Sequence, residues 1–262
     1  MSGQVVRLDR DGPVARVTLD RPQVHNAFNE EVIAGLHEAF RRLAEDDHVR
    51  VVVLAGEGPS FCAGADLDWM RRAASWSEEE NRRDAAALAA MLRAVAECPR
   101  PVVARVHGNA YGGGVGLVAA ADLAVAAATA QFAFTEVRLG LAPATIAPHV
   151  VEKIGPGWAL RLFLTGERIG AEEALRIGLV YRVVPPAELD AAVEGVVRTL
   201  LAGGPQAQAA CKELVRRVAR ERGAQVDDYT ARLIAALRTG PEGQEGILSF
   251  LEKRRPRWAS EG

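Results

Sequence analysis

The 262-residue sequence has little cysteine and few aromatic side chains. Its cysteines, Cys62, Cys98 and Cys211, lie far apart and form no Cys-x-x-Cys motif, which excludes a small disulfide-stabilised scaffold and favours a reducing compartment. The five histidines show no spacing typical of paired metal ligands. We therefore expect free thiols and no bound metal.

The sequence also lacks an excess of one charge and a long apolar run. Its 32 Lys and Arg against 34 Asp and Glu give a net charge of -2, which argues against nucleic acid or an anionic membrane as the main partner. The N-terminal segment has no apolar core, and Asp122 interrupts the longest Ala/Val/Leu stretch. We expect no signal peptide and no spanning helix, and hence a cytoplasmic protein.

The first 195 residues show an alternation of strand and helix patterns. Val5–Leu8 and Ala15–Leu19 flank a turn as in an antiparallel hairpin, and Asn29–Ala44 has helical spacing with Asn29 as its N-cap. The next expected elements are strand Arg50–Ala55, helix Glu78–Cys98 and strand Val102–Val106. This rhythm predicts an α/β fold with a mainly parallel sheet and crossover helices.

The pattern changes after residue 195. A break at Gly203-Gly204-Pro205 precedes three helical patterns, Ala207–Glu221, Val226–Leu237 and Glu242–Lys253. We expect a core region at residues 1–195 and a helical region at 196–262. The apolar faces of these helices need a cover, which closed symmetric association of several copies supplies.

A cluster of glycines, His107–Leu117, joins an apolar strand to an Ala-rich helix, where unpaired N–H groups attract negative charge. Gly114, Gly116 and Ala119 with Glu136 downstream fit a dinucleotide-binding fingerprint. The five residues between the strand and Gly112 argue against it. The alternatives are an oxyanion hole and a packed helix–strand turn.

A second glycine joint favours the oxyanion hole. The apolar strand 51–55 runs into the loop Gly56–Leu67, which is followed by a helical stretch. Two such loops can each donate one N–H to the same oxygen. Cys62 lies in this loop, where we expect a packed thiol rather than a nucleophile.

Motifs along nearly the whole chain resemble the crotonase family, also called the enoyl-CoA hydratase/isomerase family. They are, in order, Leu19-Asp-Arg-Pro22, Asn26-Ala27, Phe61-Cys-Ala-Gly-Ala-Asp-Leu67, Ala110-Tyr-Gly-Gly-Gly-Val-Gly-Leu117, Thr135-Glu-Val-Arg-Leu-Gly-Leu-Ala-Pro143, Leu164-Thr-Gly-Glu167, Ala174–Val180 and Phe250-Leu-Glu-Lys-Arg254. The resemblance implies a crotonase-like ββα superhelix with a C-terminal helical trimerisation region, assembled as a homotrimer or a dimer of trimers.

The resemblance also implies a reaction on acyl-CoA thioesters through an enolate. The amides of Ala65 and Gly113 would hold the thioester oxygen, and Glu136 would move the proton. Coenzyme A is then part of the substrate, and no separate cofactor is expected. Glu136 follows the apolar run Ala130–Phe134, and burial raises the proton affinity of a carboxylate; the alternative is a salt bridge to Arg138.

The chain departs from the family pattern at Gly116, where typical hydratases carry a second glutamate. A single carboxylate leaves three possibilities: hydration or dehydration at C2–C3, double-bond isomerisation, and acyl-CoA binding with little activity. The flanking motifs resemble hydratases of branched or carboxylated enoyl-CoAs, such as the methylglutaconyl-CoA type, and favour hydration. Arg138 is then either a ligand of a distal carboxylate or a structural ion-pair partner.

The remaining expected contacts follow from the resemblance. Trp69 and Met70 would shape the acyl pocket or pack in the core. The expected coenzyme A contacts are Val24, His25, Ala63, Asp66 and Leu67, with Phe250 and Lys253 reaching across a subunit boundary.

Overall fold

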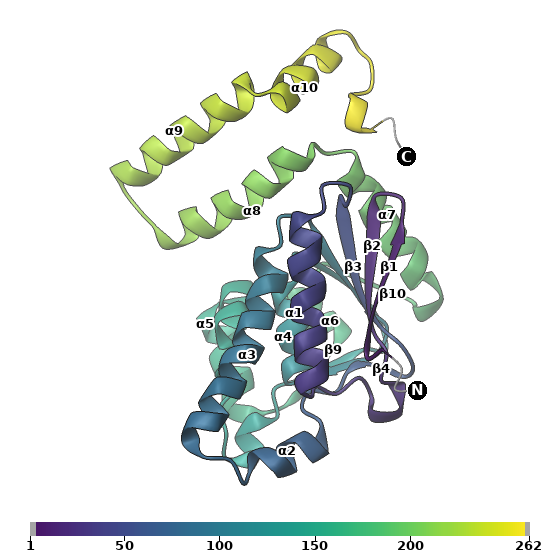
Figure 1. The fold of residues 1–262 in the computed structure, drawn as a ribbon, viewed down its shortest axis with the longest axis vertical. Helices are drawn as coiled ribbons and strands as arrows, with labels where there is room; N and C mark the ends of the chain where they lie inside the picture. Colours follow the sequence, from purple (N-terminus) through teal and green to yellow (C-terminus); the bar gives the residue numbers. More distant parts are fainter. Residues whose placement is uncertain (1–3, 260–262) are drawn as a thin grey trace.

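The computed structural model describes residues 4–259, and its main sheet has six strands (Figure 1). Strands β1 and β2 form the predicted antiparallel hairpin, and the other neighbouring pairs are parallel, as the strand–helix alternation indicates. In spatial order the strands are β1 (Val6–Asp11), β2 (Val14–Leu19), β3 (Val51–Gly56), β5 (Val102–Val106), β7 (Leu123–Ala127) and β10 (Arg182–Val184).

A second sheet has four short strands. Their order is β4 (Ser60–Cys62), β6 (Asn109–Tyr111), β8 (Gln131–Ala133) and β9 (Arg168–Gly170). Each of β3, β5 and β7 is followed within a few residues by a short strand of this sheet, which produces the expected ββα repeat. Three residues are too few for a periodic pattern, so the sequence did not indicate these strands.

Helices cover both faces of the six-stranded sheet. They are α1 (Glu30–Glu45), α2 (Leu67–Ala73), α3 (Glu78–Glu97), α4 (Gly113–Ala120), α5 (Ala147–Thr165), α6 (Ala171–Arg176) and α7 (Leu189–Leu201), with 3-10 turns η1 (Pro22–Val24), η2 (Glu136–Leu139), η3 (Pro186–Glu188) and η4 (Arg257–Ala259). Asn29 caps α1 as predicted, since its side chain accepts a hydrogen bond from the amide of Val32.

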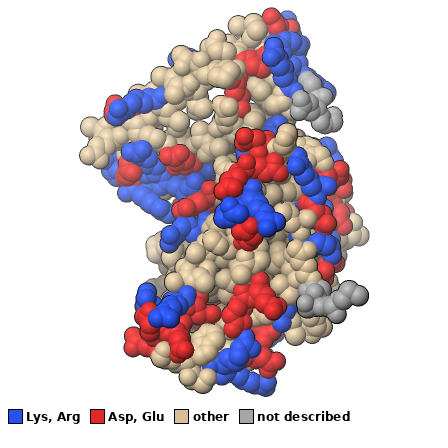
Figure 2. Space-filling view, in the orientation of Figure 1, with Lys and Arg blue, Asp and Glu red and all other residues tan. Residues whose placement is uncertain are grey.

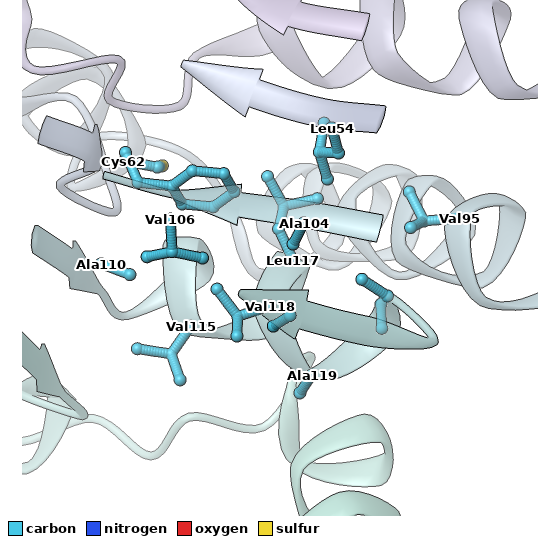
Figure 3. Close-up of a cluster of buried hydrophobic side chains, with 14 of the residues drawn as sticks. Leu54, Cys62, Val95, Ala104, Val106, Ala110, Val115, Leu117, Val118 and Ala119 are labelled. Atoms are coloured by element: carbon cyan, nitrogen blue, oxygen red, sulfur yellow. The ribbon is translucent and has the colours of Figure 1, made fainter. Parts of the chain in front are cut away.

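The helix α4 lies at the centre of the larger core. Val115, Leu117 and Val118 on this helix pack among residues from β3 and β5, including Leu54 and Ala104 (Figure 3). On the opposite face of the sheet, α7 covers a separate apolar cluster. The N-terminal end of α4 is thereby held at a fixed position by apolar contacts along the helix.

The C-terminal region consists of α8 (Pro205–Arg220), α9 (Ala224–Thr239) and α10 (Pro241–Leu251). The boundary expected at residue 195 lies inside α7, and the chain breaks only at Ala202–Gly204. Ser249 is the only buried residue of these three helices. Figure 2 shows broad uncharged areas over this end of the molecule. Within residues 4–259, no helix has the length and apolar character needed to cross a membrane.

Asn26 connects the chain after β2 to the loop after β3. It is fully buried and adopts a positive φ of 56°. Its Nδ2 donates to the carbonyl oxygens of Glu57, Ser60 and Phe61 at 2.8, 2.9 and 3.2 Å, and its Oδ1 accepts from the amide of Arg21 at 2.9 Å. One buried amide thus fixes the loop in which the expected oxyanion donor Ala65 lies.

We expect Asn26→Ala to lower the free energy of unfolding by about 3 kcal/mol, because several buried groups lose their partners and water cannot replace them. Asn81→Ala is the matched control: the Asn81 amide also reaches three carbonyl oxygens, at 3.1–3.2 Å, but is exposed. Its loss should be below about 1 kcal/mol. Equal losses in urea unfolding would contradict the role assigned to Asn26.

Candidate active site

The two glycine loops expected to form the oxyanion hole meet at Gly64 and Gly112. A Cβ atom built on Gly64 would lie 2.9 Å from the carbonyl oxygen of Tyr111, and one built on Gly112 would lie 3.9 Å from the Cα of Gly64. Both residues have positive φ, at 90° and 48°. Glycine is needed at these positions for its backbone angles and for the close approach of the two chains.

The amides of Ala65 and Gly113 are both available at this junction. Phe28 bonds to the residues on either side of Ala65, donating to the Gly64 carbonyl at 2.6 Å and accepting from the Asp66 amide at 2.9 Å. Gly113 is the first residue of α4. In the described part of the chain, neither the Ala65 nor the Gly113 amide donates a hydrogen bond. Both residues line the same cavity of about 460 Å³.

Glu136 lines this cavity beside the two loops. It is the first residue of η2. Three residues earlier in the chain, the carbonyl of Ala133 accepts a hydrogen bond of 2.9 Å from the amide of Gly112, which joins this segment to the second glycine loop. A Cβ built on Gly112 would lie 3.1 Å from Glu136 Oε1, and Glu136 Oε2 is buried without a hydrogen-bond partner. Burial raises the pKa of this carboxyl. An uncompensated carboxylate therefore lies next to two available amides.

Ile146 fills the position where a second acid would lie. A Cβ built on Gly116 would lie 2.4 Å from Ile146 Cγ2 and 3.6 Å from Leu92 Cδ2, so this site has no room for a glutamate side chain. A Cβ on Gly114 would lie 2.3 Å from the carbonyl oxygen of Cys62. These glycines pack against protein atoms, which leaves no space for the nucleotide that the dinucleotide fingerprint would require.

The walls of the cavity are mainly apolar. Ala63 and Leu67 line it, as the resemblance implies. Trp69 and Met70 also line it, which agrees with the expectation that they shape the acyl pocket. Thr145 and Ile146 line it too, and residues that the sequence did not indicate also contribute: Phe28, Leu88, Asp84, Leu139, Leu141, Ala142 and Pro143. Asp84 had no sequence signal, because it directly follows the charged residues Arg82 and Arg83, which look like a solvated face.

Asp66 positions the first loop and does not line the cavity. It is the N-cap of α2, accepting from the amides of Asp68 and Trp69 at 2.9 and 3.1 Å, and it pairs with Arg21 at 3.0 Å. Burial alone raises the pKa of this carboxyl, but these hydrogen bonds outweigh burial and lower it. Val24 and His25 lie beside the same loop, because the amide of Ala63 donates to the carbonyl of His25 at 3.0 Å.

Several other predicted residues lie outside the cavity. Arg138 is exposed, does not line it and forms no ion pair with Glu136 within residues 4–259. Phe250 and Lys253 lie on and just after α10, at the far end of the molecule from α2 (Figure 1). Cys62 is a packed thiol: it is fully buried, and burial raises its pKa to about 12. The described residues contain no cluster of His, Cys, Asp and Glu suited to a metal ion.

Known proteins are similar to this chain in both sequence and fold. The sequence model of the family described as enoyl-CoA hydratase/isomerase matches residues 9–261. A carnitinyl-CoA dehydratase of Salmonella arizonae is 35% identical over 258 residues, which cover 97% of each chain. An enoyl-CoA hydratase structure from Mycobacterium smegmatis shares 40% identity, with a TM-score of 0.92 and coverage of 97% of this chain and 98% of that one.

A further solved structure, Pseudomonas aeruginosa AtuE, shares 38% identity with a TM-score of 0.94, and the match covers 97% of this chain and 99% of that one. Fold and site together define an enzyme with the crotonase fold. The chain belongs to the enoyl-CoA hydratase/isomerase family, which implies an acyl-CoA thioester as its substrate.

We expect Glu136→Gln to lower turnover by about 10²–10⁴-fold, the usual contribution of a general acid or base. In wild type, the hydration rate should rise with pH through the raised pKa of Glu136, as the carboxylate forms, and this limb should vanish in the variant. Steady-state rates on enoyl-CoA across pH provide the measurement. Glu31→Gln, an exposed change on α1, is the control.

The same variant should be at least as stable as wild type at neutral pH. Because folding raises the pKa of Glu136, the stability linked to its protonated form is present at low pH and is lost as pH rises through the folded-state pKa. The neutral amide removes that cost. A variant that retains wild-type turnover, or that loses turnover through unfolding in a thermal melt, would contradict the assigned role.

Proposed function

We propose that this chain adds water across the C2–C3 double bond of an enoyl-CoA thioester, or removes it in the reverse direction, with Glu136 as its single acid–base residue. The observation that carries the proposal is the meeting of the buried Glu136 carboxylate with the two available amides of Ala65 and Gly113 in one apolar cavity.

The two amides would bind the thioester oxygen. As water adds to C3, the double-bond electrons move toward that oxygen, and an enolate forms. Each N–H donor fixed in a cavity with little water is worth about 3 kcal/mol to such a transition state. Gly113 stands at the positive end of α4, which adds a favourable dipole.

Glu136 would take one proton of the attacking water while the water oxygen bonds to C3. The enolate then returns its electrons to form the C2–H bond, and the same carboxyl supplies the proton. The raised pKa of Glu136 suits both steps, because the group must accept and release a proton near working pH. Dehydration reverses this sequence.

The missing second acid keeps two other functions in consideration. Ile146 occupies the space beside Gly116, so a water molecule cannot be held between two carboxylates. With one carboxylate, Glu136 could instead carry a proton between C4 and C2 and shift a double bond. The third function is acyl-CoA binding with little turnover.

Mass spectrometry of products distinguishes the three functions. The protein is incubated with crotonyl-CoA, methylglutaconyl-CoA and a 3-enoyl-CoA in ¹⁸O-labelled water. We expect 2-enoyl-CoA to gain one labelled water. A shift of the double bond at unchanged mass, without water gain, would instead show an isomerase, and tight binding without any product would show a binding protein.

We further propose that several copies associate through α8–α10, forming a homotrimer or a dimer of trimers in the cytoplasm. Ile234, Ile247 and Leu251 are exposed, and Phe250 is 82% exposed. Exposed apolar residues this numerous on three helices are typical of an interface. Phe250 and Lys253 could then contact the coenzyme A bound to a neighbouring copy, since they lie far from their own cavity (Figure 1).

Sedimentation equilibrium tests this association. Wild type should have three or six times the monomer mass, and Ile234→Glu together with Ile247→Glu should shift it toward the monomer, because charge in an apolar interface is unfavourable. Gln206→Glu, at an exposed position on the same group of helices, is the control. A monomeric wild type would contradict the proposal.

A further inference from the structure

The cavity has two carboxylates, and Asp84 has no role in the mechanism above. Its Oδ1 accepts a hydrogen bond from the indole Nε1 of Trp69 at 3.2 Å. Asp84 is half-buried, and burial raises the pKa of its carboxyl, with Glu30 adding a smaller effect in the same direction. Among the described residues, Asp84 and Glu136 are the two charged ones that line the cavity.

The cations nearest in sequence do not neutralise Asp84. Arg82 and Arg83 both pair with Glu79, at 2.7 and 3.1 Å. One turn away on α3, the residues that face the same side as Asp84 are Glu80 and Leu88. Across residues 4–259, no Lys or Arg forms an ion pair with Asp84. The Asp84 carboxylate therefore lines the cavity without a positive partner among the described residues.

The helical spacing places Asp84 at the far end of the acyl cavity. Leu92 packs beside Gly116 at the reacting end, Leu88 lines the cavity one turn earlier, and Asp84 lines it two turns earlier. Eight residues of α-helix span about 12 Å, which about ten carbons of an extended acyl chain match at roughly 1.2 Å per carbon. Asp84 is thus too distant to replace the missing acid at position 116.

We propose that Asp84 binds the far end of the acyl chain, and that the substrate carries a hydrogen-bond donor there, either a hydroxyl or an ammonium group. A half-buried carboxylate without a counter-ion gains most from such a donor. The same charge rejects a terminal carboxylate, and within residues 4–259 no Arg or Lys lines the cavity to receive one. This inference rests on the proposed hydration reaction and replaces the carboxylated substrate expected through Arg138.

Four acyl-CoA esters of matched length test the proposal: 2-dodecenoyl-CoA and its analogues with a hydroxyl, an amino or a carboxyl group at the far end. With wild type, we expect one donor analogue to exceed the plain chain by about tenfold or more in kcat/KM, mainly through KM. The carboxylated analogue should be the poorest. Preference for the amino analogue indicates a cation, and preference for the hydroxyl analogue indicates a neutral donor.

Three variants assign the preference to Asp84. Asp84→Leu should lose the preference for both donor analogues over the plain chain. Asp84→Asn, which retains an acceptor oxygen, should lose the preference for the amino analogue and keep that for the hydroxyl analogue. Asp68→Asn changes an exposed acid on α2 that does not line the cavity, and should behave as wild type.

The outcomes separate this inference from the proposed function. Wild-type hydration of 2-dodecenoyl-CoA with no gain from a donor, a preference for the carboxylated analogue, or a donor preference that survives in Asp84→Leu overturns the role of Asp84 and leaves the hydration reaction intact. Failure to hydrate any of the four esters overturns the proposed function itself.

Discussion

The close backbone approach between Gly64 and Gly112 is the constraint on which the rest of the site depends. A Cβ atom on Gly64 would lie 2.9 Å from the Tyr111 carbonyl oxygen, and the positive φ of Gly112 disfavours a side chain there. Phe28 packs so tightly against Gly113 that a Cβ there would lie 2.7 Å from its ring. Phe28 is also hydrogen-bonded to Gly64 and Asp66, the residues on either side of Ala65. The Ala65 amide itself points away from Phe28. The Gly113 amide is available for a different reason, because it is the first residue of α4 and has no partner within the helix.

The cavity concentrates groups that are costly to bury. Glu136 and Asp84 are carboxylates whose pKa burial raises, and each loses water without gaining a cation. The fold offsets this cost elsewhere, through the large core around α4 and the buried amide of Asn26. Functional sites typically contain residues that lower the stability of the fold and that packing does not require. At Gly116 packing takes precedence instead, because Ile146 fills the space of a second acid with an apolar side chain.

The sequence predicted those features that depend on local pattern or on a complete motif. The N-cap at Asn29, the hairpin, the long helices and the packed Cys62 follow from spacing and composition. The crotonase fold followed from motifs in a fixed order. Features that depend on contacts between distant segments were not accessible: the short strands of the second sheet, the Gly116–Ile146 contact and the place of Asp84 in the cavity wall. The place of Arg138 outside the cavity was not accessible for the same reason, because nearness in sequence does not determine which face of a turn a side chain takes.

The far end of α4 connects the site to the C-terminal helices. Lys153 Nζ donates to the carbonyl oxygens of Ala121 and Asp122 at 2.7 and 2.8 Å, which places positive charge at the negative end of α4. Asp122 in turn accepts from the amide of Val102 at 2.7 Å and pairs with Lys212 of α8 at 2.6 Å. Asp122 is therefore bonded to both β5 and α8. These bonds connect the C-terminal helices to α4, the helix that begins at Gly113. An interface formed by α8–α10 would therefore fix the oxyanion donor as well as bury apolar surface.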